Sequence, residues 1–533
     1  PSRLRPLLLA ASIAAAVILA AGAGWWINLN SKAVDVAVAP VTLAVLPFDA
    51  LDDDPEITRM AGTVPRDMAD AFSRGGISVM ATARSMAFGG DAKARAADEL
   101  GAELLIDGTV KRQGGTAHIA ARLYHAERGI TLWTTDLTAD PGDPFVDERL
   151  ASVFSRVIYW PAPLRILNSR RPNAVEETRT FLRILEFNYT GDSIQSRQAA
   201  HDFARNAPDL STARTASAIE TIHAFPHLSV EERIKELRFA RSESEEALRL
   251  APRDGSAYMA AMRVLAPDRW EERIRMMREA IRIDPQYTRI DNNLAEVLLA
   301  TGASMEALAV AKRARASEPL SAARPVLLAN AHLANGEIAQ MNSVLDPHLQ
   351  IWPQDAVAIQ LRFYALAWTG KLDEAEAQLP RMFAPGDAGL PHQVLVAMLK
   401  AKRSGDARDA DQVTRLCTDI GAQDIDTASA CLTAGGMLNR PDAAVAGAEI
   451  TLPRIHDPAS DAEDLWIRNR LCCSTDGSAA RLFLPWMAPM RADPRIIDVF
   501  ERIGLVAYWR ETGNWPDFCE TEPQSVCAQM KSG

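Results

Sequence analysis

The sequence predicts a small α+β domain followed by an all-α solenoid, with one transmembrane helix in front of both. Three observations carry this prediction: an apolar run over residues 7–27, short β-rich segments alternating with helical ones, and prolines that return at a nearly constant interval further along the chain. We expect a transmembrane helix and linker over 1–40, an α+β domain over 41–160, and a repeat array with a C-terminal cap over 173–533.

Length and charge limit the function classes. A chain of 533 residues exceeds one compact core. Its net charge of −11 argues against a domain that binds nucleic acid through phosphates. That charge says nothing about a DNA-binding domain outside this chain.

The run from Leu7 to Ile27 is almost entirely apolar, and a helix of about 21 residues spans the roughly 30 Å core of a bilayer. Arg3 and Arg5 precede it, and Trp25 and Trp26 lie at its end, where indoles favour the membrane interface. Positive charge at the N-terminal end predicts that this end is cytoplasmic. The remainder of the chain is then on the far side of the membrane.

A cleaved signal peptide is the alternative interpretation of this segment. Residues 21–23 (Ala-Gly-Ala) have the small side chains of a cleavage site. Cleavage would leave a new N-terminus near Gly24. The length of the apolar run and the two tryptophans favour a retained helix, and both interpretations place the bulk of the chain outside the cytoplasm.

Residues 41–160 predict the element order βαβαβββα. Apolar, β-branched segments indicate strands, and helical spacing of apolar residues indicates helices. An acidic loop over 49–55 follows the first strand, and its aspartates 52–54 indicate a solvated turn more than a metal site, because no second acidic cluster follows. The predicted strands are 41–48, 76–80, 104–111, 118–124 and 131–137, and the predicted helices are 59–74, 92–100 and 145–158.

These segments carry a resemblance. "LAVLPFDAL", "RSMAFGG", "ELGAELLIDGTVKRQGGTAHIAARLYHAERGITLWTTDL" and "DPFVDERLA" resemble the TolB-N-terminal-like domain, with the full element order over 41–160. The resemblance implies a sensory or interaction module without catalysis. Ala50, Asp52 and Asp53 depart from the family pattern in one loop.

From residue 173 onward the sequence is periodic. Glycines at 302, 336 and 370 each follow a proline by half a period, and "EALRLAP" and "EAIRIDP" end two of the units. Proline ends a helix and glycine favours the turn inside a pair. A helix–turn–helix unit of about 34 residues resembles the tetratricopeptide repeat, which implies stacked helix pairs. The prolines are Pro252, Pro285, Pro319 and Pro353.

Less regular helix pairs flank these repeats. Residues 176–219 predict an earlier, divergent pair, and Pro208 lies further from Pro252 than one period, which requires an insertion between them. Residues 388–490 predict further degenerate pairs. We expect residues 493–519 to cap the apolar end of the stack.

The concave face of such an array is its binding face. The tetratricopeptide resemblance places a set of polar side chains there, which would hydrogen-bond an extended peptide. The alternative is that they are only the polar lining of a structural stack. The set comprises Arg289, Asn292, Glu296, Asn330, Gln360 and Tyr364.

The sequence contains no nucleophile, zinc or phosphate-binding motif, so we expect no enzymatic activity, no cofactor and no metal site. His223 and His227 have the spacing of a ligand pair, but Pro226 between them interrupts the helix that such a pair needs.

The six cysteines lie late in the chain and allow 15 complete pairings. Disulfides are expected if the compartment is oxidising, and buried free thiols are the alternative. Cys519 and Cys527 are the first pair to test. Adjacent Cys472 and Cys473 would form a strained mutual disulfide.

A membrane helix, a TolB-N-terminal-like domain and tetratricopeptide repeats together resemble the C-terminal portion of CadC/ToxR-type transmembrane transcriptional regulators. The resemblance implies a bacterial inner-membrane protein with its bulk in the periplasm and signal transduction through protein or peptide partners. A homodimer is a separate expectation, in which binding outside would bias dimerisation and the single helix would transmit the change to the cytoplasmic side. DNA binding would belong to a winged-helix domain upstream of Pro1, which is not a methionine.

Two alternatives remain for the function. The chain would be the outer region of a receptor enzyme (a nucleotide cyclase or a kinase) or a plain periplasmic scaffold. What precedes Pro1 distinguishes them.

Overall fold

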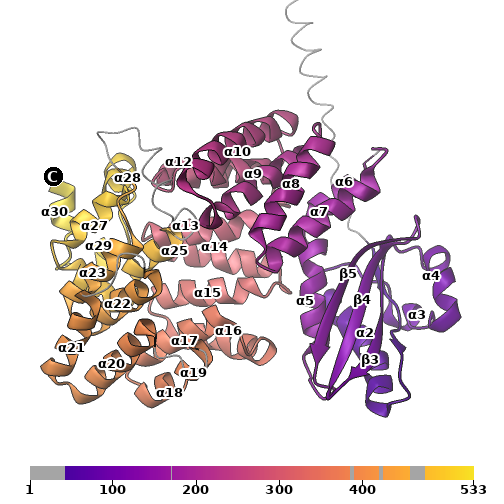
Figure 1. Ribbon diagram of the computed structural model, residues 1–533, viewed down its shortest axis with the longest axis horizontal. Coiled ribbons are helices and arrows are strands. Elements are labelled where there is room, and N and C mark those ends of the chain that lie inside the picture. Colours follow the sequence, from indigo (N-terminus) through magenta and orange to yellow (C-terminus); the bar gives the residue numbers. More distant parts are fainter. Residues whose placement is uncertain (1–41, 170, 384–388, 419–423, 457–474, 533) are drawn as a thin grey trace, which may run out of the picture. The chain divides into compact units, whose positions relative to one another are not determined.

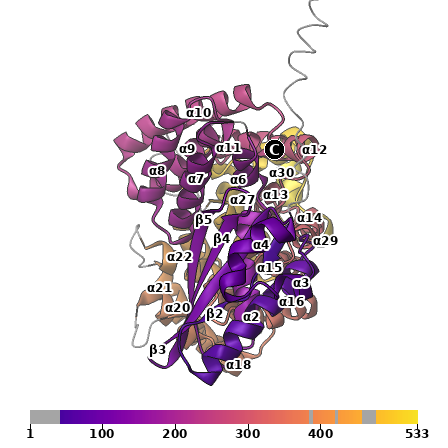
Figure 2. The same ribbon diagram turned by 90° about the vertical axis from the view of Figure 1, so that its right-hand side faces the viewer.

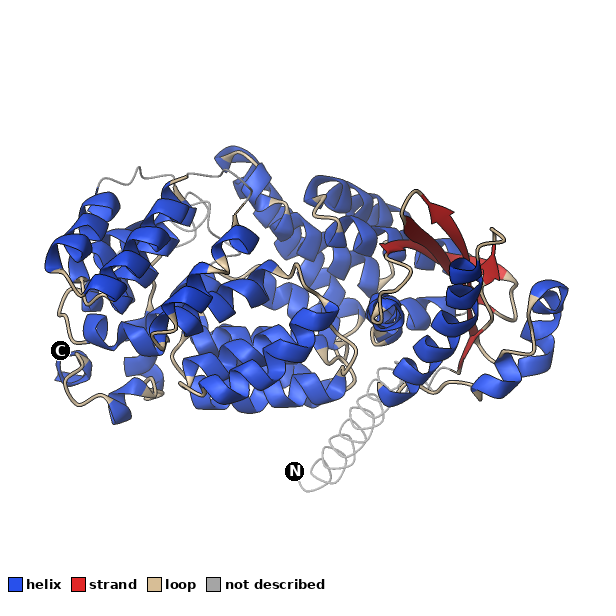
Figure 3. Cartoon of the chain, turned by 90° about the horizontal axis from the view of Figure 1, so that it is seen from below, coloured by secondary structure: helices blue, strands red, loops and turns tan. Residues whose placement is uncertain are grey.

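The computed structural model describes residues 42–169, 171–383, 389–418, 424–456 and 475–532. Within these ranges the chain is mostly helical, with one small mixed sheet in its N-terminal part and a helical array after it (Figure 3).

In the same ranges, no helix is both long enough and apolar enough to cross a bilayer. The transmembrane helix predicted over residues 7–27 lies outside the described residues.

The sheet has the strand order β1-β3-β4-β5, and β2 also pairs with β3. β1 and β2 run parallel to β3, whereas β3, β4 and β5 form an antiparallel meander. The three long strands confirm the sequence prediction, although each extends slightly beyond it at one or both ends. The bounds are β1 Leu43–Val45, β2 Asp49–Ala50, β3 Leu104–Gln113, β4 Thr116–His125 and β5 Ile130–Ala139.

Helices cover both faces of the sheet at β1, which is why this strand is fully buried. α2 (Pro55–Arg74) contacts β1 and β3 and packs on α5 (Val146–Ile158) (Figures 1 and 2). α4 (Lys93–Leu100) packs on the opposite face, where Ala96 and Leu100 join a buried cluster with Ala44 and Leu105. The short α3 and η1 span Thr82–Ser85 and Gly90–Ala92.

α2 begins at Pro55, whereas the sequence predicts a loop up to that residue and a helix from 59. Asp54 explains the earlier start, because its carboxylate accepts hydrogen bonds from the amides of Glu56 (2.8 Å) and Ile57 (3.4 Å). Proline is also favoured in the first helical turn. Arg112 of β3 donates to the same carboxylate from Nε (2.9 Å), which ties the acidic turn to the sheet.

The strand predicted over residues 76–80 is wrong in extent. Only Val79 bridges to Leu43. The first part of the segment instead closes α2, because the amide of Ile77 donates to the carbonyl of Phe72 (3.0 Å) and Gly76 has φ of +78°.

After the short α6 (Pro161–Leu167), antiparallel helix pairs follow one another to residue 451. The bounds are α7 Ala174–Tyr189, α8 Ser193–Asn206, α9 Ser211–His223, η2 Phe225–His227, α10 Val230–Leu250, α11 Gly255–Arg263, α12 Trp270–Ile283, α13 Arg289–Ala300, α14 Ser304–Ser317, α15 Ala323–Ala334, α16 Ile338–Ile351, α17 Ala356–Trp368, α18 Leu372–Glu376, α19 Leu379–Met382, α20 Leu390–Ser404, α21 Ala407–Thr418, α22 Ile425–Met437 and α23 Pro441–Thr451.

The structure confirms that the repeat prolines and glycines lie at the ends of helices, as the sequence predicts. Each of the four repeat prolines lies two residues after the end of a helix, namely α10, α12, α14 or α16. Gly302, Gly336 and Gly370 each lie two residues after the end of α13, α15 or α17, with φ of +80°, +72° and +80°. Left-handed backbone at these turns favours glycine.

The divergent region before Pro252 consists of two helix pairs. Pro208 lies two residues after α8, like the other repeat prolines. The extra residues between Pro208 and Pro252 are taken up by η2 and by α10, which has 21 residues where α12 has 14.

Residues 475–532, which we call the C-terminal module, fold back onto the array. They contact the last pair, α22 and α23, as a cap would, and they also contact α12 and α13 (Figure 1). The contacts with the last pair lie where the sequence predicts a cap, and the contacts with the middle of the array are additional. The elements are α25 Thr475–Ala480, η3 Arg481–Phe483, η4 Pro485–Met487, α26 Ala488–Arg491, α27 Ile496–Arg502, α28 Leu505–Thr512, α29 Phe518–Thr521 and α30 Cys527–Ser532.

We predict that Asp54→Asn lowers the free energy of unfolding at pH 7, with a loss that shrinks below pH about 4. The hydrogen bond from Arg112, and then the amide of Glu56, hold the pKa of Asp54 below its ordinary value. Stability from a lowered carboxylate pKa is present above the ordinary pKa and is lost as pH falls through the lowered one. Urea unfolding at pH 7 and pH 3 tests this, with exposed Asp53→Asn as control. A pH-independent loss would contradict the ion-pair explanation.

Candidate functional site

One repeat position recurs on the first helices of three successive pairs. Met262 of α11, Glu296 of α13 and Asn330 of α15 occupy equivalent places in successive units. All three line one cavity of about 400 Å³. The helical period of the sequence thus places equivalent side chains around a common space, as expected for the inner face of a repeat array.

The C-terminal module forms the other wall of this cavity. α25 contacts α13, and η3 follows it directly. The repeat helices add Arg263, Arg273, Asn293 and Leu299 to the lining, and the module adds Asp476, Gly477, Ser478, Ala480 and Arg481.

The cavity contains a chain of polar contacts along α13. Arg263 donates from Nη2 to Asn293 Oδ1 (2.6 Å), and Asn292 donates from Nδ2 to Glu296 Oε1 (2.7 Å). Desolvation raises the pKa of Glu296, Arg263 lowers it in part, and the negative charge of Asp476 raises it further. The Glu296 side chain is nevertheless exposed to solvent at the cavity wall, so water offsets part of this desolvation.

Arg273 joins the two walls. Its guanidinium donates to Asp476 Oδ1 (3.0 Å) and Oδ2, and from Nη1 to the carbonyl of Pro267 (2.9 Å). It also lies 5.3 Å from the ring centre of Trp270. The Arg273 side chain is 9% exposed and that of Asp476 23%, so this ion pair is largely withdrawn from water.

The structure brings together three of the six predicted groove residues, because Glu296 and Asn330 line the cavity and Asn292 bonds to Glu296.

The other three lie elsewhere. Arg289 lies 4.0 Å over the ring of Trp160. Tyr364 is buried, with its ring 5.8 Å from that of Trp486 in the module. Gln360 is half-buried on α17 and is not part of the cavity lining.

Sequence reasoning missed several cavity residues. Met262 shares the repeat position of Glu296 and Asn330, so the period alone could have found it. Arg273 has no such signal, because it lies on the second helix of its pair and its partner Asp476 is 203 residues away.

Two buried tryptophans attach the module to the array. Trp270 of α12 donates from Nε1 to the carbonyl of Ile503 (2.8 Å), and Trp509 of α28 donates from Nε1 to the carbonyl of Thr301 (3.0 Å). One indole N–H of the array thus donates to the module, and one indole N–H of the module donates to the array. A buried indole N–H needs such a partner.

Aromatic side chains form the core of the module. Phe500 stacks on Phe483 and lies edge-on to Trp509, with ring centres 5.9 and 5.1 Å apart. Phe518 stacks on both phenylalanines. The cluster lies against the array, because a Cβ at Gly302 would approach Phe483 to 2.8 Å.

Asp517 of the module caps a helix of the array. α14 has Ala303 at its N-cap position, which has no side-chain hydrogen bond to offer. Asp517 Oδ2 instead accepts from the amide of Met305 (2.8 Å) and from Ser304 Oγ (2.9 Å), and the Asp517 amide donates to the carbonyl of Gly302 (3.0 Å). A residue 212 positions away thus takes the role of an N-cap.

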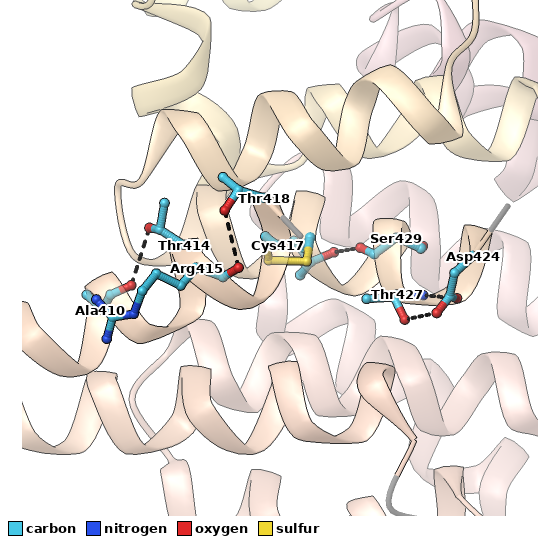
Figure 4. Close-up of a disulfide and its surroundings, with 10 residues drawn as sticks. Ala410, Thr414, Arg415, Cys417, Thr418, Asp424, Thr427 and Ser429 are labelled. Carbon is cyan, nitrogen blue, oxygen red and sulfur yellow. Dashed lines mark hydrogen bonds between the residues drawn. A yellow bond between two sulfur atoms is a disulfide. The ribbon is translucent and has the colours of Figure 1, made fainter. Parts of the chain in front are cut away.

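Four of the cysteines form two disulfides. Cys519 is joined to Cys527, the pair that the sequence puts first. Cys417 of α21 is joined to Cys431 of α22 (Figure 4), a pairing that the sequence did not single out. Cys472 and Cys473 lie outside the described residues.

Among the described residues, no group of three or more His, Cys, Asp or Glu side chains is placed to hold a metal ion. His223, which the sequence argues against as a metal ligand, faces Asn188 Nδ2 (2.9 Å) and Glu220 Oε2 (3.3 Å).

We predict that Asp517→Ala costs about 1 kcal/mol, the usual value of an N-cap. Amide hydrogen exchange at Met305 should accelerate, because that N–H loses its acceptor. Glu520→Ala is the control, since this exposed acid lies three residues further along, and its effect should stay within about 0.5 kcal/mol. Unchanged exchange at Met305 in the Asp517 variant would show that the module does not cap α14.

We predict that alkylation without a reductant leaves Cys417, Cys431, Cys519 and Cys527 unmodified, and that all four react after reduction and unfolding. Peptide mapping by mass spectrometry of protein taken from its native compartment measures this. Modification of these four thiols before reduction would contradict both disulfides.

No protein-family model matches the chain, and no curated protein matches it. We therefore infer the function from the cavity and from the module that closes it.

Proposed function

We propose that the chain is the sensory and protein-interaction region of a bacterial signalling protein, and that it binds protein or peptide partners through the inner face of its helical array. The observation that carries this proposal is the polar cavity at one repeat position of three successive pairs, where Glu296 and Asn330 lie. Polar side chains at this position in two of the three repeats suit recognition of an extended chain better than they suit a dry helix-packing core.

The array is proposed to be of the tetratricopeptide type, whose period is about 34 residues. The spacing of the repeat prolines, their place two residues after the second helix of a pair, and the left-handed glycines two residues after the first helix support this.

The setting of the protein is proposed from the sequence. The apolar run over residues 7–27 would anchor the chain in the inner membrane, with the bulk in the periplasm. The two disulfides support an oxidising compartment. The resemblance to transmembrane regulators would place DNA binding in a domain upstream of this chain.

Site-specific photocrosslinking in the native membrane tests the binding face. A benzophenone side chain at Asn330 should give a discrete adduct with a second protein, because this residue lines the cavity. The same group at Lys312, exposed on α14, is the control and should give none. Equal labelling from both positions, or none from Asn330, would contradict the proposal.

A further inference from the structure

We propose that the repeat wall of this cavity binds an acidic peptide segment of a partner protein, which displaces α25 so that its carboxylate takes the place of Asp476 on Arg273. This inference rests on the proposed function and names the chemistry of the partner. In the structure, the chain's own α25 occupies the position that the partner would occupy.

Arg273 shows what the site recognises. The planar guanidinium reaches both carboxylate oxygens of Asp476, a geometry that matches a carboxylate. The carbonyl of Pro267 and the ring of Trp270 hold the guanidinium in place from its other sides. Because these contacts do not depend on α25, the arginine remains positioned when Asp476 leaves.

The charge around the cavity favours an acidic occupant. Within the described part of the chain, Arg263 hydrogen-bonds to Asn293 Oδ1 and Arg481 to Ser429 Oγ, both neutral acceptors. Without Asp476, the three arginines of the described lining face one acid, Glu296. The Glu296 side chain is exposed to solvent, which screens its repulsion of a second anion.

α25 is suited to displacement. It has six residues, too few for a helix that is stable by itself. It inserts one acidic side chain, Asp476, beside the small Gly477, Ser478 and Ala480. A partner that supplies a carboxylate and a short stretch of small residues would reproduce these contacts, so the segment acts as an intramolecular competitor.

The test uses the full chain and a fluorescein-labelled peptide, Ser-Thr-Asp-Gly-Ser-Ala-Ala, which has the sequence of the chain's own segment 474–480. Fluorescence anisotropy measures its affinity for the wild type and for Asp476→Asn. The variant should bind roughly tenfold more tightly, because the intramolecular carboxylate no longer competes for Arg273. The same peptide with Asn in place of Asp should bind neither protein measurably.

Two further variants separate the site from a general charge effect. Asp476→Asn combined with Arg273→Gln should lose the gain in affinity. Asp291→Asn is the control, because it removes the more exposed ion pair of Arg313 (2.7 Å), neither member of which lines the cavity, and it should leave peptide affinity unchanged. Circular dichroism checks that each variant is folded, and Arg481→Gln provides a second, milder test of the cationic wall.

The outcomes distinguish the two proposals. Equal affinity of wild type and Asp476→Asn, together with crosslinks at Asn330, would overturn the acidic-peptide inference and leave the binding face standing. If the affinities are equal and Asn330 also gives no crosslink, both the acidic-peptide inference and the proposed binding face are overturned. If inorganic phosphate displaces the peptide from Asp476→Asn at concentrations matching the peptide's own affinity, the site is a general anion site, and the inference is likewise overturned.

Discussion

Attachment of the C-terminal module to the middle of the array is the constraint on which the rest of the described structure depends. Helix pairs stacked in a row leave an inner face and helix ends that need partners. The module supplies them: an indole from each side donates to a carbonyl of the other, and an aspartate completes the start of α14. These polar contacts surround a core of stacked aromatics, so the apolar gain and the hydrogen bonds depend on the same docked position.

The candidate site follows from this attachment. The same module that covers the aromatic face brings α25 against α13 and closes the cavity. Asn330 is half-buried beside the module, whereas Glu296 stays exposed at the cavity wall. Closure withdraws Arg273 and Asp476 from water, and in a desolvated setting a charged hydrogen bond is stronger and a mismatched occupant is penalised more. Because a partner would have to displace α25 from Arg273, selectivity would come from this competition as well as from the repeats.

Sequence patterns predicted those helices and strands whose formation depends on residues close together in the chain. The meander β3–β5 alternates in hydrophobicity, and proline and glycine mark the ends of repeat helices, so both could be predicted from the sequence. The bridge at Val79 depends on its pairing with Leu43, and the early start of α2 depends on the carboxylate of Asp54. The spacing of apolar residues in the sequence does not predict such individual contacts. Glu296 and Asn330 line the cavity at one repeat position, and Asn292 bonds to Glu296. Tyr364 shares that repeat position but is buried near Trp486 of the module, so the period alone does not determine which residues line the cavity. Arg273 and Asp476 were not found, because nothing local links residues so far apart in the chain.

The cap that Asp517 provides for α14 also has a consequence for the order of folding. A simple repeat array is quasi-one-dimensional, so each unit can settle as soon as its neighbour exists. Here the start of a central helix is completed by a residue 212 positions later. During synthesis, the N-cap of α14 can form only after residue 517 has emerged. Loss of the module would therefore destabilise a helix in the middle of the array. A chain truncated before the module would therefore expose an uncapped α14 and an uncovered inner face, so the central repeats depend on the presence of the C-terminal residues.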